Sequence, residues 1–127
     1  MDKACILIVE DERIIALDLR SKVARLGYVV AGMAHTGQEA IRLAAELTPD
    51  LVLMDIILDG GMDGIDAATQ ILQNRTIPVV FVSACNDQGT RERASILGCA
   101  GFVSKPVDSR ELAARLSDAL QCTESPG

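Results

Sequence analysis

The chain has very few aromatic side chains: Tyr28, Phe81 and Phe102 make up 2% of its 127 residues, and tryptophan is absent. Proteins that bind single-stranded nucleic acid stack bases on aromatic rings, and this chain lacks such a platform. Basic residues are also in the minority, with 12 Lys and Arg against 18 Asp and Glu and a formal net charge of -6. An excess of negative charge repels nucleic acid and anionic lipid. Direct binding to nucleic acid or to a membrane is therefore not expected.

The cysteines and the apolar runs lack the patterns of metal-binding and membrane proteins. None of the 4 cysteines forms a C-x-x-C pair, so a zinc site and a disulfide framework are not expected. Cys5 and Cys99 lie in or beside apolar runs, where free cysteine usually packs as a small hydrophobic residue. No apolar run approaches the roughly 20 residues that span a bilayer, and the first residues lack the layout of a signal peptide. We expect a cytoplasmic protein.

The length of 127 residues suits one domain, and no fused sensor or DNA-binding domain is expected. We predict a single domain over residues 1–127, with a core over 4–121 and a frayed tail over 122–127.

Short apolar runs alternate with helical patterns along the whole chain. The predicted strands cover residues 4–9, 28–34, 51–54, 77–82 and 100–103. The predicted helices cover residues 12–26, 37–48, 65–74 and 88–97, and a last helix follows Asp108. Thr36 and Glu39 have the spacing of a capping box at the start of the second helix. Apolar strands that are each followed by a helix indicate a parallel sheet covered on both faces, which is a doubly wound α/β domain.

Charged and polar residues stand where the predicted strands end. Glu10, Asp11 and Glu12 follow the first strand, Asp55 follows the third, Ser83 the fourth and Lys105 the fifth. In a doubly wound sheet the working site lies outside the carboxyl ends of the strands, so these side chains meet at one edge. Clustered carboxylates repel one another unless cations neutralise them. Lys105 and a divalent cation would do so, and oxygen ligands with open coordination positions suit magnesium.

Phosphoryl transfer is the chemistry that fits this set of residues. The sequence has no G-x-x-x-x-G-K-[ST] loop and no G-x-G-x-x-G, so it offers no nucleotide site. An aspartate can act as the nucleophile and become an aspartyl phosphate. Magnesium and Lys105 would neutralise the phosphoryl oxygens, and Ser83 would donate a hydrogen bond to one of them. Ser83 lacks the G-x-S-x-G context of a hydrolase nucleophile.

Five short motifs in order resemble the receiver domain of two-component response regulators. They are Ile8-Val9-Glu10-Asp11-Glu12, Leu53-Met54-Asp55-Ile56, Met62-Asp63-Gly64, Val82-Ser83-Ala84 and Ser104-Lys105-Pro106. The resemblance extends from Ala4 to about Leu120. It implies a flavodoxin-like (CheY-like) fold, with a five-stranded parallel sheet of order 2-1-3-4-5 and five helices.

The resemblance also implies the roles of the acidic residues. Asp55 would accept a phosphoryl group from a phosphohistidine on a sensor histidine kinase or a histidine phosphotransfer protein. Asp11, Asp55 and the backbone carbonyl of Ile57 would bind Mg²⁺ or Mn²⁺ directly, and Glu10 would act partly through water. The domain would be a signalling protein that promotes only its own phosphorylation and dephosphorylation, not an enzyme that acts on other substrates.

The remaining implied roles concern the switch and its output. Lys105 would pair with the phosphate, and the bond between Lys105 and Pro106 would be cis. Phe102 would move inward when the Ser83 hydroxyl turns toward the phosphate. The output face would lie within residues 88–120, where a downstream protein or a second copy would bind.

The sequence departs from the commonest receiver pattern in four places. The loop after Asp55 is one residue longer, and Glu10 stands where aspartate is more common. Ser83 replaces threonine and keeps the hydroxyl, and Cys85 occupies a position that tunes phosphate lifetime in the family. A docking module of the same fold that works without phosphorylation is the alternative. Loss of an acidic residue or of Lys105 would favour it, and all are present. A magnesium-dependent phosphatase would need a second aspartate at Ile57.

Overall fold

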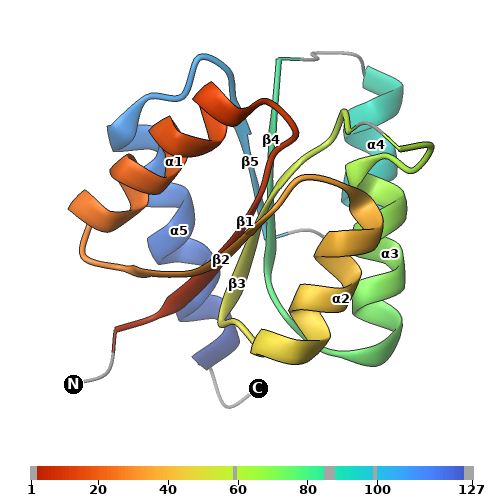
Figure 1. The fold of residues 1–127 in the computed structure, drawn as a ribbon, viewed down its shortest axis with the longest axis horizontal. Coiled ribbons are helices and arrows are strands. Elements are labelled where there is room, and N and C mark those ends of the chain that lie inside the picture. Colours follow the sequence, from red (N-terminus) through yellow and green to blue (C-terminus); the bar gives the residue numbers. More distant parts are fainter. Residues whose placement is uncertain (1–2, 59, 85–87, 99, 125–127) are drawn as a thin grey trace.

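The computed structural model describes residues 3–58, 60–84, 88–98 and 100–124, with side chains up to residue 121. Strands and helices alternate along these residues, as the sequence predicts (Figure 1). The strands are β1 (Cys5–Val9), β2 (Val29–Ala34), β3 (Leu51–Asp55), β4 (Val79–Ser83) and β5 (Gly101–Ser104). The helices are α1 (Arg13–Arg25), α2 (Gly37–Leu47), α3 (Gly64–Asn74), α4 (Gln88–Ile96) and α5 (Ser109–Glu124).

The five strands form one parallel sheet in the order β2-β1-β3-β4-β5, which confirms the predicted fold class. Helices α1 and α5 cover one face of the sheet, and α2, α3 and α4 cover the other (Figure 1). Because all five strands are parallel, their carboxyl ends lie at the same edge of the sheet. This edge carries the loops that follow β1, β3, β4 and β5.

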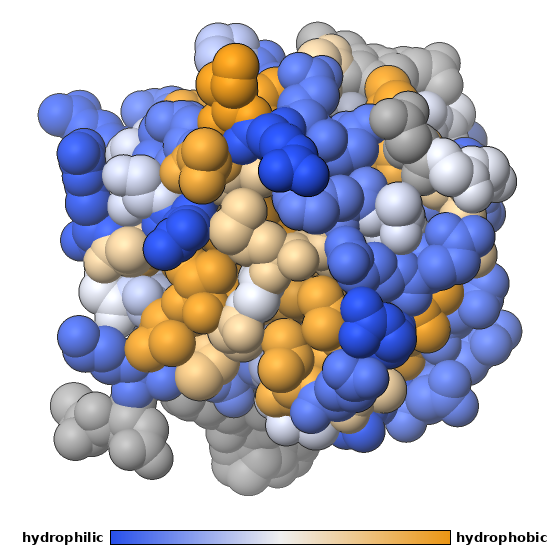
Figure 2. All heavy atoms as spheres, in the orientation of Figure 1, coloured by the Kyte–Doolittle hydropathy of each residue, from blue (hydrophilic) through white to orange (hydrophobic). Residues whose placement is uncertain are grey.

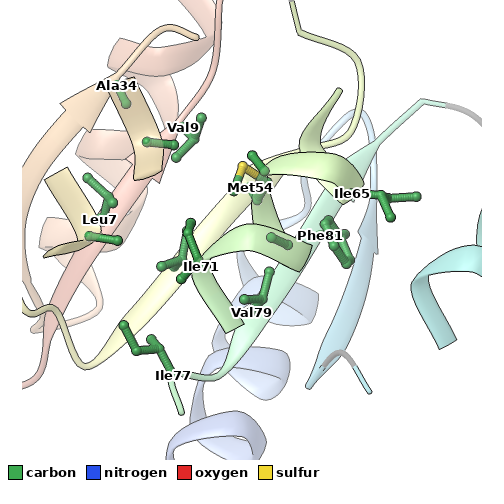
Figure 3. Close-up of a cluster of buried hydrophobic side chains, with 14 of the residues drawn as sticks. Leu7, Val9, Ala34, Met54, Ile65, Ile71, Ile77, Val79 and Phe81 are labelled. Atoms are coloured by element: carbon green, nitrogen blue, oxygen red, sulfur yellow. The ribbon is translucent and has the colours of Figure 1, made fainter. Parts of the chain in front are cut away.

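Two apolar layers hold the helices to the sheet, because successive strand residues point to opposite faces. Met54 and Phe81 face α3 and are fully buried, and they pack with the buried Ile65 and Ile71 of that helix (Figure 3). The opposite layer joins alternate strand residues such as Leu53 to α1 and α5. Burial of this aliphatic surface is the main force that closes the domain and fixes the strand ends.

The first residues of α2 and α3 are capped by side chains. The Thr36 hydroxyl accepts a hydrogen bond from the Glu39 backbone N–H at 3.1 Å. The predicted capping box is wrong in its second half, because the Glu39 carboxylate accepts from the backbone N–H of His35, at 2.7 Å. A complete box is present instead at α3, where Asp63 and Asp66 exchange hydrogen bonds. Asp66 has a shorter side chain than glutamate and still reaches the N-cap backbone.

Several boundaries differ from the sequence prediction. Strand β4 begins at Val79, since Pro78 has no N–H to contribute to a ladder. Helix α5 continues to Glu124, past the predicted core limit at residue 121. Residues 125–127 lie outside the described residues, and the frayed tail stays a prediction. No proline or glycine interrupts the chain between Leu112 and Glu124, and nothing ends the helix earlier.

The cysteine predictions are tested only at Cys5. Its side chain is half-buried beside the start of the sheet and is not a core residue. Cys85 and Cys99 lie outside the described residues, and the predictions made for them stay predictions.

Apolar side chains are exposed on the face formed by α1, β2 and the end of α2 (Figure 2). Ile14 and Leu17 on α1 are the most open of them, at 84% and 55% of their surface. Leu47, predicted on the inner side of α2, is also exposed because it occupies the last turn of that helix. Within the described residues, no helix is long and apolar enough to cross a bilayer.

Candidate functional site

The carboxyl ends of the central strands bring the predicted site residues to one edge of the sheet. In the parallel register Val9 lies beside Met54, and Asp55 lies beside Val82. Glu10 follows Val9 directly and is fully buried, while Asp55 is the last residue of β3. Ser83 pairs with Ser104 one position further along, so Lys105 extends from the end of β5 toward the same place. The topology alone gathers these residues from four distant segments.

Lys105 contacts two carboxylates from two different strands. Its Nζ lies 2.8 Å from Glu10 Oε1 and 3.0 Å from Asp55 Oδ2. The exposed fractions of these side chains are 16% for Lys105, 0% for Glu10 and 6% for Asp55. Asp55 Oδ1 accepts a further hydrogen bond from the backbone N–H of Ile57, at 3.2 Å. The phosphoacceptor predicted from the sequence is therefore held in one orientation through both of its oxygens.

Burial and mutual repulsion perturb the ionisation of this cluster. Burial raises the pKa of Glu10 from 4.5 to about 7, and the neighbouring Asp55 carboxylate adds to the rise. The hydrogen bond from Lys105 lowers the pKa of Glu10 but does not outweigh these effects. Burial would lower the pKa of Lys105, yet its hydrogen bonds to Glu10 and Asp55 raise it above its ordinary 10.5. Lys105 therefore stays protonated, but its single positive charge does not balance the carboxylates of the site.

The donor set fits a divalent metal ion. Glu10, Asp11 and Asp55 each offer a carboxylate oxygen, and these oxygens lie within 4.8 Å of one another. One lysine faces three carboxylates, so a cation of charge two would bring the cluster to neutrality. Burial is the main cause of the raised pKa of Glu10, and the uncompensated charge of Asp55 adds to it. Hard carboxylate oxygens with space for water are the ligands that magnesium takes in proteins.

Gly64 allows the start of α3 to pack directly against the end of β3. Its N–H donates to the Ile56 carbonyl at 2.6 Å. A Cβ atom on Gly64 would lie 2.0 Å from the backbone oxygen of Asp55, which no side chain tolerates. The Met-Asp-Gly motif thus ends in glycine because two backbones meet there.

The other predicted site residues occupy different surroundings. Ser83 is buried at the end of β4, and its carbonyl accepts from the Lys105 N–H at 3.1 Å. The peptide bond between Lys105 and Pro106 is cis. Phe102 does not lie in the carboxylate cluster, because it packs at the edge of the apolar layer under α2, α3 and α4. The side chain of Ile57 is 63% exposed, and the predicted role of its carbonyl as a metal ligand stays a prediction.

His35 supports the site from outside. Its ring Nδ1 lies 3.0 Å from the carbonyl oxygen of Glu10. Its backbone N–H donates a hydrogen bond to the Glu39 carboxylate. The Glu10 N–H donates in turn to the carbonyl of Ala34. Both backbone groups of Glu10 are therefore anchored to the end of β2, which positions its side chain.

Sequence reasoning missed one polar contact near the site. Arg93 of α4 binds Asp63 and Asp66, the two capping residues of α3. The spacing Asp63-x-x-Asp66 is readable in the sequence as a capping box, but the partner from α4 is not. From the sequence, Arg93 is assigned only to the output face within residues 88–120.

Comparison with known proteins identifies the family. The sequence profile of the response regulator receiver domain matches residues 6–117. The transcriptional regulatory protein PdtaR of Mycobacterium tuberculosis is 39% identical over 107 residues, which are 84% of this chain and 52% of PdtaR. The phyllosphere-induced regulator PhyR of Methylorubrum extorquens is 38% identical over 119 residues, 91% of this chain and 43% of PhyR. This chain thus spans about half the length of the curated relatives it matches.

Solved structures agree with this assignment. The signal receiver domain of a modulated diguanylate cyclase from Desulfovibrio desulfuricans superposes with a TM-score of 0.90 and 35% identity, covering 97% of this chain and 98% of that one. The anti-anti-sigma factor PhyR from Bartonella quintana gives a TM-score of 0.81 and 34% identity, covering 98% of this chain and 50% of that one. Sequence, fold and strand-end residues agree, and the chain belongs to the response regulator receiver domain family.

Proposed function

We propose that Asp55 is a phosphoacceptor that takes a phosphoryl group from a phosphohistidine on a sensor histidine kinase or a histidine phosphotransfer protein. The observation that carries the proposal is the setting of the Asp55 carboxylate. It lies 3.0 Å from the Lys105 ammonium and inside a cluster of three carboxylates that could hold a metal ion. A carboxylate with only a structural role would need a cationic partner such as Lys105, but it would not need two further carboxylates beside it.

The transfer makes one bond and breaks one. An Asp55 carboxylate oxygen bonds to phosphorus, and the bond between phosphorus and the histidine nitrogen breaks, leaving its electron pair on the imidazole. The product is an acyl phosphate. The N–H of Ile57 and the Nζ of Lys105 hold the two carboxylate oxygens, so the nucleophile approaches in a fixed direction. Because phosphoryl transfer demands mainly positioning and charge neutralisation, these contacts supply much of what the protein must provide.

Mg²⁺ or Mn²⁺ held by Asp11, Asp55, Glu10 and the Ile57 carbonyl would supply the positive charge that stabilises the phosphoryl oxygens. After transfer, the negative charge would lie on the phosphoryl oxygens and no longer on the Asp55 carboxylate. The Lys105 ammonium, which is already at the site, would then pair with the phosphoryl group. The Ser83 hydroxyl, at the end of the adjacent strand, would donate to a further oxygen.

A docking module that works without phosphorylation is the weaker alternative. Such a module needs the fold and a partner surface, but it does not need Glu10, Asp11, Asp55 and Lys105 together. Burying Glu10 beside Asp55 is unfavourable for the carboxylate form, as its raised pKa shows. A site that costs stability in this way is better explained by phosphoryl chemistry than by docking.

Exposed surfaces suit protein partners on two sides. Ile14 is 84% exposed on the first turn of α1, close to Asp11, and offers an apolar contact to a phosphohistidine donor.

We place the output on α4, β5 and α5, where a downstream protein or a second copy would bind. The similar proteins include transcriptional regulators and an anti-anti-sigma factor, so related domains serve different outputs. The cytoplasmic location stays a prediction.

Labelling with a small phosphodonor tests the proposal. Intact-mass measurement after incubation with acetyl phosphate and Mg²⁺ should show one added phosphoryl group on the wild type and none on Asp55→Asn. Asp118→Asn is the matched control, because it removes an equally charged but exposed aspartate on α5, and it should label like the wild type. Chelation of the metal should abolish labelling. Equal labelling of Asp55→Asn and the wild type would contradict the proposal.

A further inference from the structure

Helix α4 is held to the domain by little apolar contact. Ala94 is its single buried residue among the described positions, and Ile96 is 87% exposed. The other four helices place longer apolar side chains into the two core layers. An element with so little buried surface opens easily, and its position depends on polar contacts.

Two arginines of α4 supply such contacts. The Arg91 guanidinium lies over the ring of Phe102 on β5, 4.5 Å from its centroid. Arg93 reaches the neighbouring helix α3, with Nη1 3.1 Å from Asp63 Oδ2 and Nη2 3.4 Å from Asp66 Oδ1. Figure 1 shows α4 beside the upper part of α3, near the edge of the sheet that carries Asp55. One guanidinium therefore joins α4 to two carboxylates of another element.

These two carboxylates are the capping box of α3. Asp63 Oδ1 accepts from the Asp66 N–H at 2.8 Å, and Asp66 Oδ2 accepts from the Asp63 N–H at 3.3 Å. The oxygens that Arg93 contacts are the remaining ones, Asp63 Oδ2 and Asp66 Oδ1. Arg93 thus completes a three-residue unit in which every carboxylate oxygen has a partner, and it neutralises part of the charge there.

The start of α3 is in turn fixed to the phosphoacceptor strand. Gly64 follows Asp63, and its backbone packs so closely on Asp55 that a Cβ atom would lie 2.0 Å from the Asp55 oxygen. Its N–H is bound to the Ile56 carbonyl at 2.6 Å. A displacement of the Asp55 backbone would therefore move the N-terminus of α3, because no space separates them.

We propose that Arg93 is a positioning residue that connects α4 to the phosphoacceptor site through the capped N-terminus of α3. The path runs from Asp55 to Gly64, to the carboxylates of Asp63 and Asp66, and to the Arg93 guanidinium. This proposal rests on the proposed function, since it assigns a role to Arg93 in transmitting the state of Asp55.

The variant Arg93→Gln removes the charge from an exposed side chain, and we expect it to keep the fold. Arg42→Gln is a closely matched control, because Arg42 also binds one half-buried and one exposed carboxylate, Glu39 and Glu46, but all three lie on α2. Amide hydrogen exchange of residues 88–97 is measured for the wild type and both variants. Each protein is measured in a chelator and again with Mg²⁺ and beryllium fluoride, which mimics a phosphoryl group on aspartate.

In the chelator, we expect α4 of Arg93→Gln to exchange about two- to fivefold faster than the wild type, the range for loss of exposed ion pairs. High salt should bring the wild type toward the variant, since these charges are screened. The decisive quantity is the ratio of α4 exchange rates with and without beryllium fluoride. A merely stabilising contact would change both rates by the same factor, whereas a connecting residue changes the ratio. We expect the ratio to move toward one in Arg93→Gln and to stay at the wild-type value in Arg42→Gln.

Two results would overturn the proposal. One is α4 exchange in Arg93→Gln that matches Arg42→Gln in both conditions. The other is an unchanged ratio despite faster exchange. Failure of the proposed function is distinguishable, because it appears as absence of acetyl phosphate labelling in the wild type. In that case the exchange rates in the chelator still decide whether Arg93 holds α4 to α3, and equal rates would refute that contact.

Discussion

The buried Glu10 carboxylate should make the stability of the metal-free domain depend on pH. Burial raises the pKa of Glu10 from 4.5 in the unfolded chain to about 7 in the folded one. The folded protein therefore binds a proton more tightly than the unfolded protein does. A raised carboxyl pKa favours folding at low pH, and this contribution is lost as the pH rises through about 7. With these two pKa values, the loss between about pH 5 and pH 8 is on the order of 2 to 3 kcal/mol.

The variant Glu10→Gln isolates this effect, because glutamine keeps the shape and does not titrate. We expect the free energy of unfolding of the wild type to fall relative to that of Glu10→Gln by roughly 2 to 3 kcal/mol over this range. Lys105 stays charged in both states throughout the range, since its pKa is raised above 10.5, so it adds no slope. Urea unfolding in a chelator, followed by circular dichroism at several pH values, measures the difference.

A control for the loss of one carboxylate is Glu111→Gln, which lies exposed on the first turn of α5. Its unfolding free energy should follow the pH dependence of the wild type. Curves for the wild type and Glu10→Gln that stay parallel within about 0.5 kcal/mol would refute the reasoning, because one pKa unit corresponds to about 1.4 kcal/mol. Adding Mg²⁺ at about pH 8 should raise the stability of the wild type, since an ion that binds only the folded state stabilises it.

Three further substitutions test the surroundings of the site. Gly64→Ala places a Cβ against the Asp55 backbone oxygen and should cost about 3 kcal/mol of unfolding free energy, and an unchanged urea midpoint would show that the two backbones can separate. Lys105→Gln leaves Glu10 and Asp55 without a cation and should lower the free energy of unfolding by about 3 kcal/mol in a chelator at about pH 8. Mg²⁺ should restore much of this loss, and a loss that Mg²⁺ does not reduce would argue against a shared cation site. Asp63→Ala removes the N-cap of α3 and should lower the free energy of unfolding by about 1 kcal/mol. An unchanged free energy of unfolding would mean that the cap contributes nothing.

The sequence predicts the architecture because strand and helix periods are local properties. Apolar runs of four to seven residues between amphipathic segments specify a buried parallel sheet, and the observed order confirms it. The meeting of Glu10, Asp55 and Lys105 follows from the same pattern, since parallel strands end at one edge. Residues that stand directly after a strand are thus placed by topology alone.

Contacts between helices were not predictable in the same way. The approach of Arg93 to Asp63 depends on where α4 packs against α3, which no local pattern specifies. The Glu39 carboxylate binds His35 and not Thr36 because the backbone just before the cap lies within its reach. The contact of Lys105 with both carboxylates is likewise a matter of side-chain reach within the fold, beyond what strand-end position can specify.

The central claim is that Asp55 forms the acyl phosphate, and chemical trapping tests it at the level of one residue. The wild type is treated with acetyl phosphate and Mg²⁺ and then reduced with borohydride, which converts an aspartyl phosphate to homoserine. Peptide mass spectrometry then locates the altered residue. We predict homoserine at position 55 and at no other aspartate. Homoserine at Asp11 or another aspartate in place of Asp55, or no homoserine in a protein that has gained phosphate, would contradict the account.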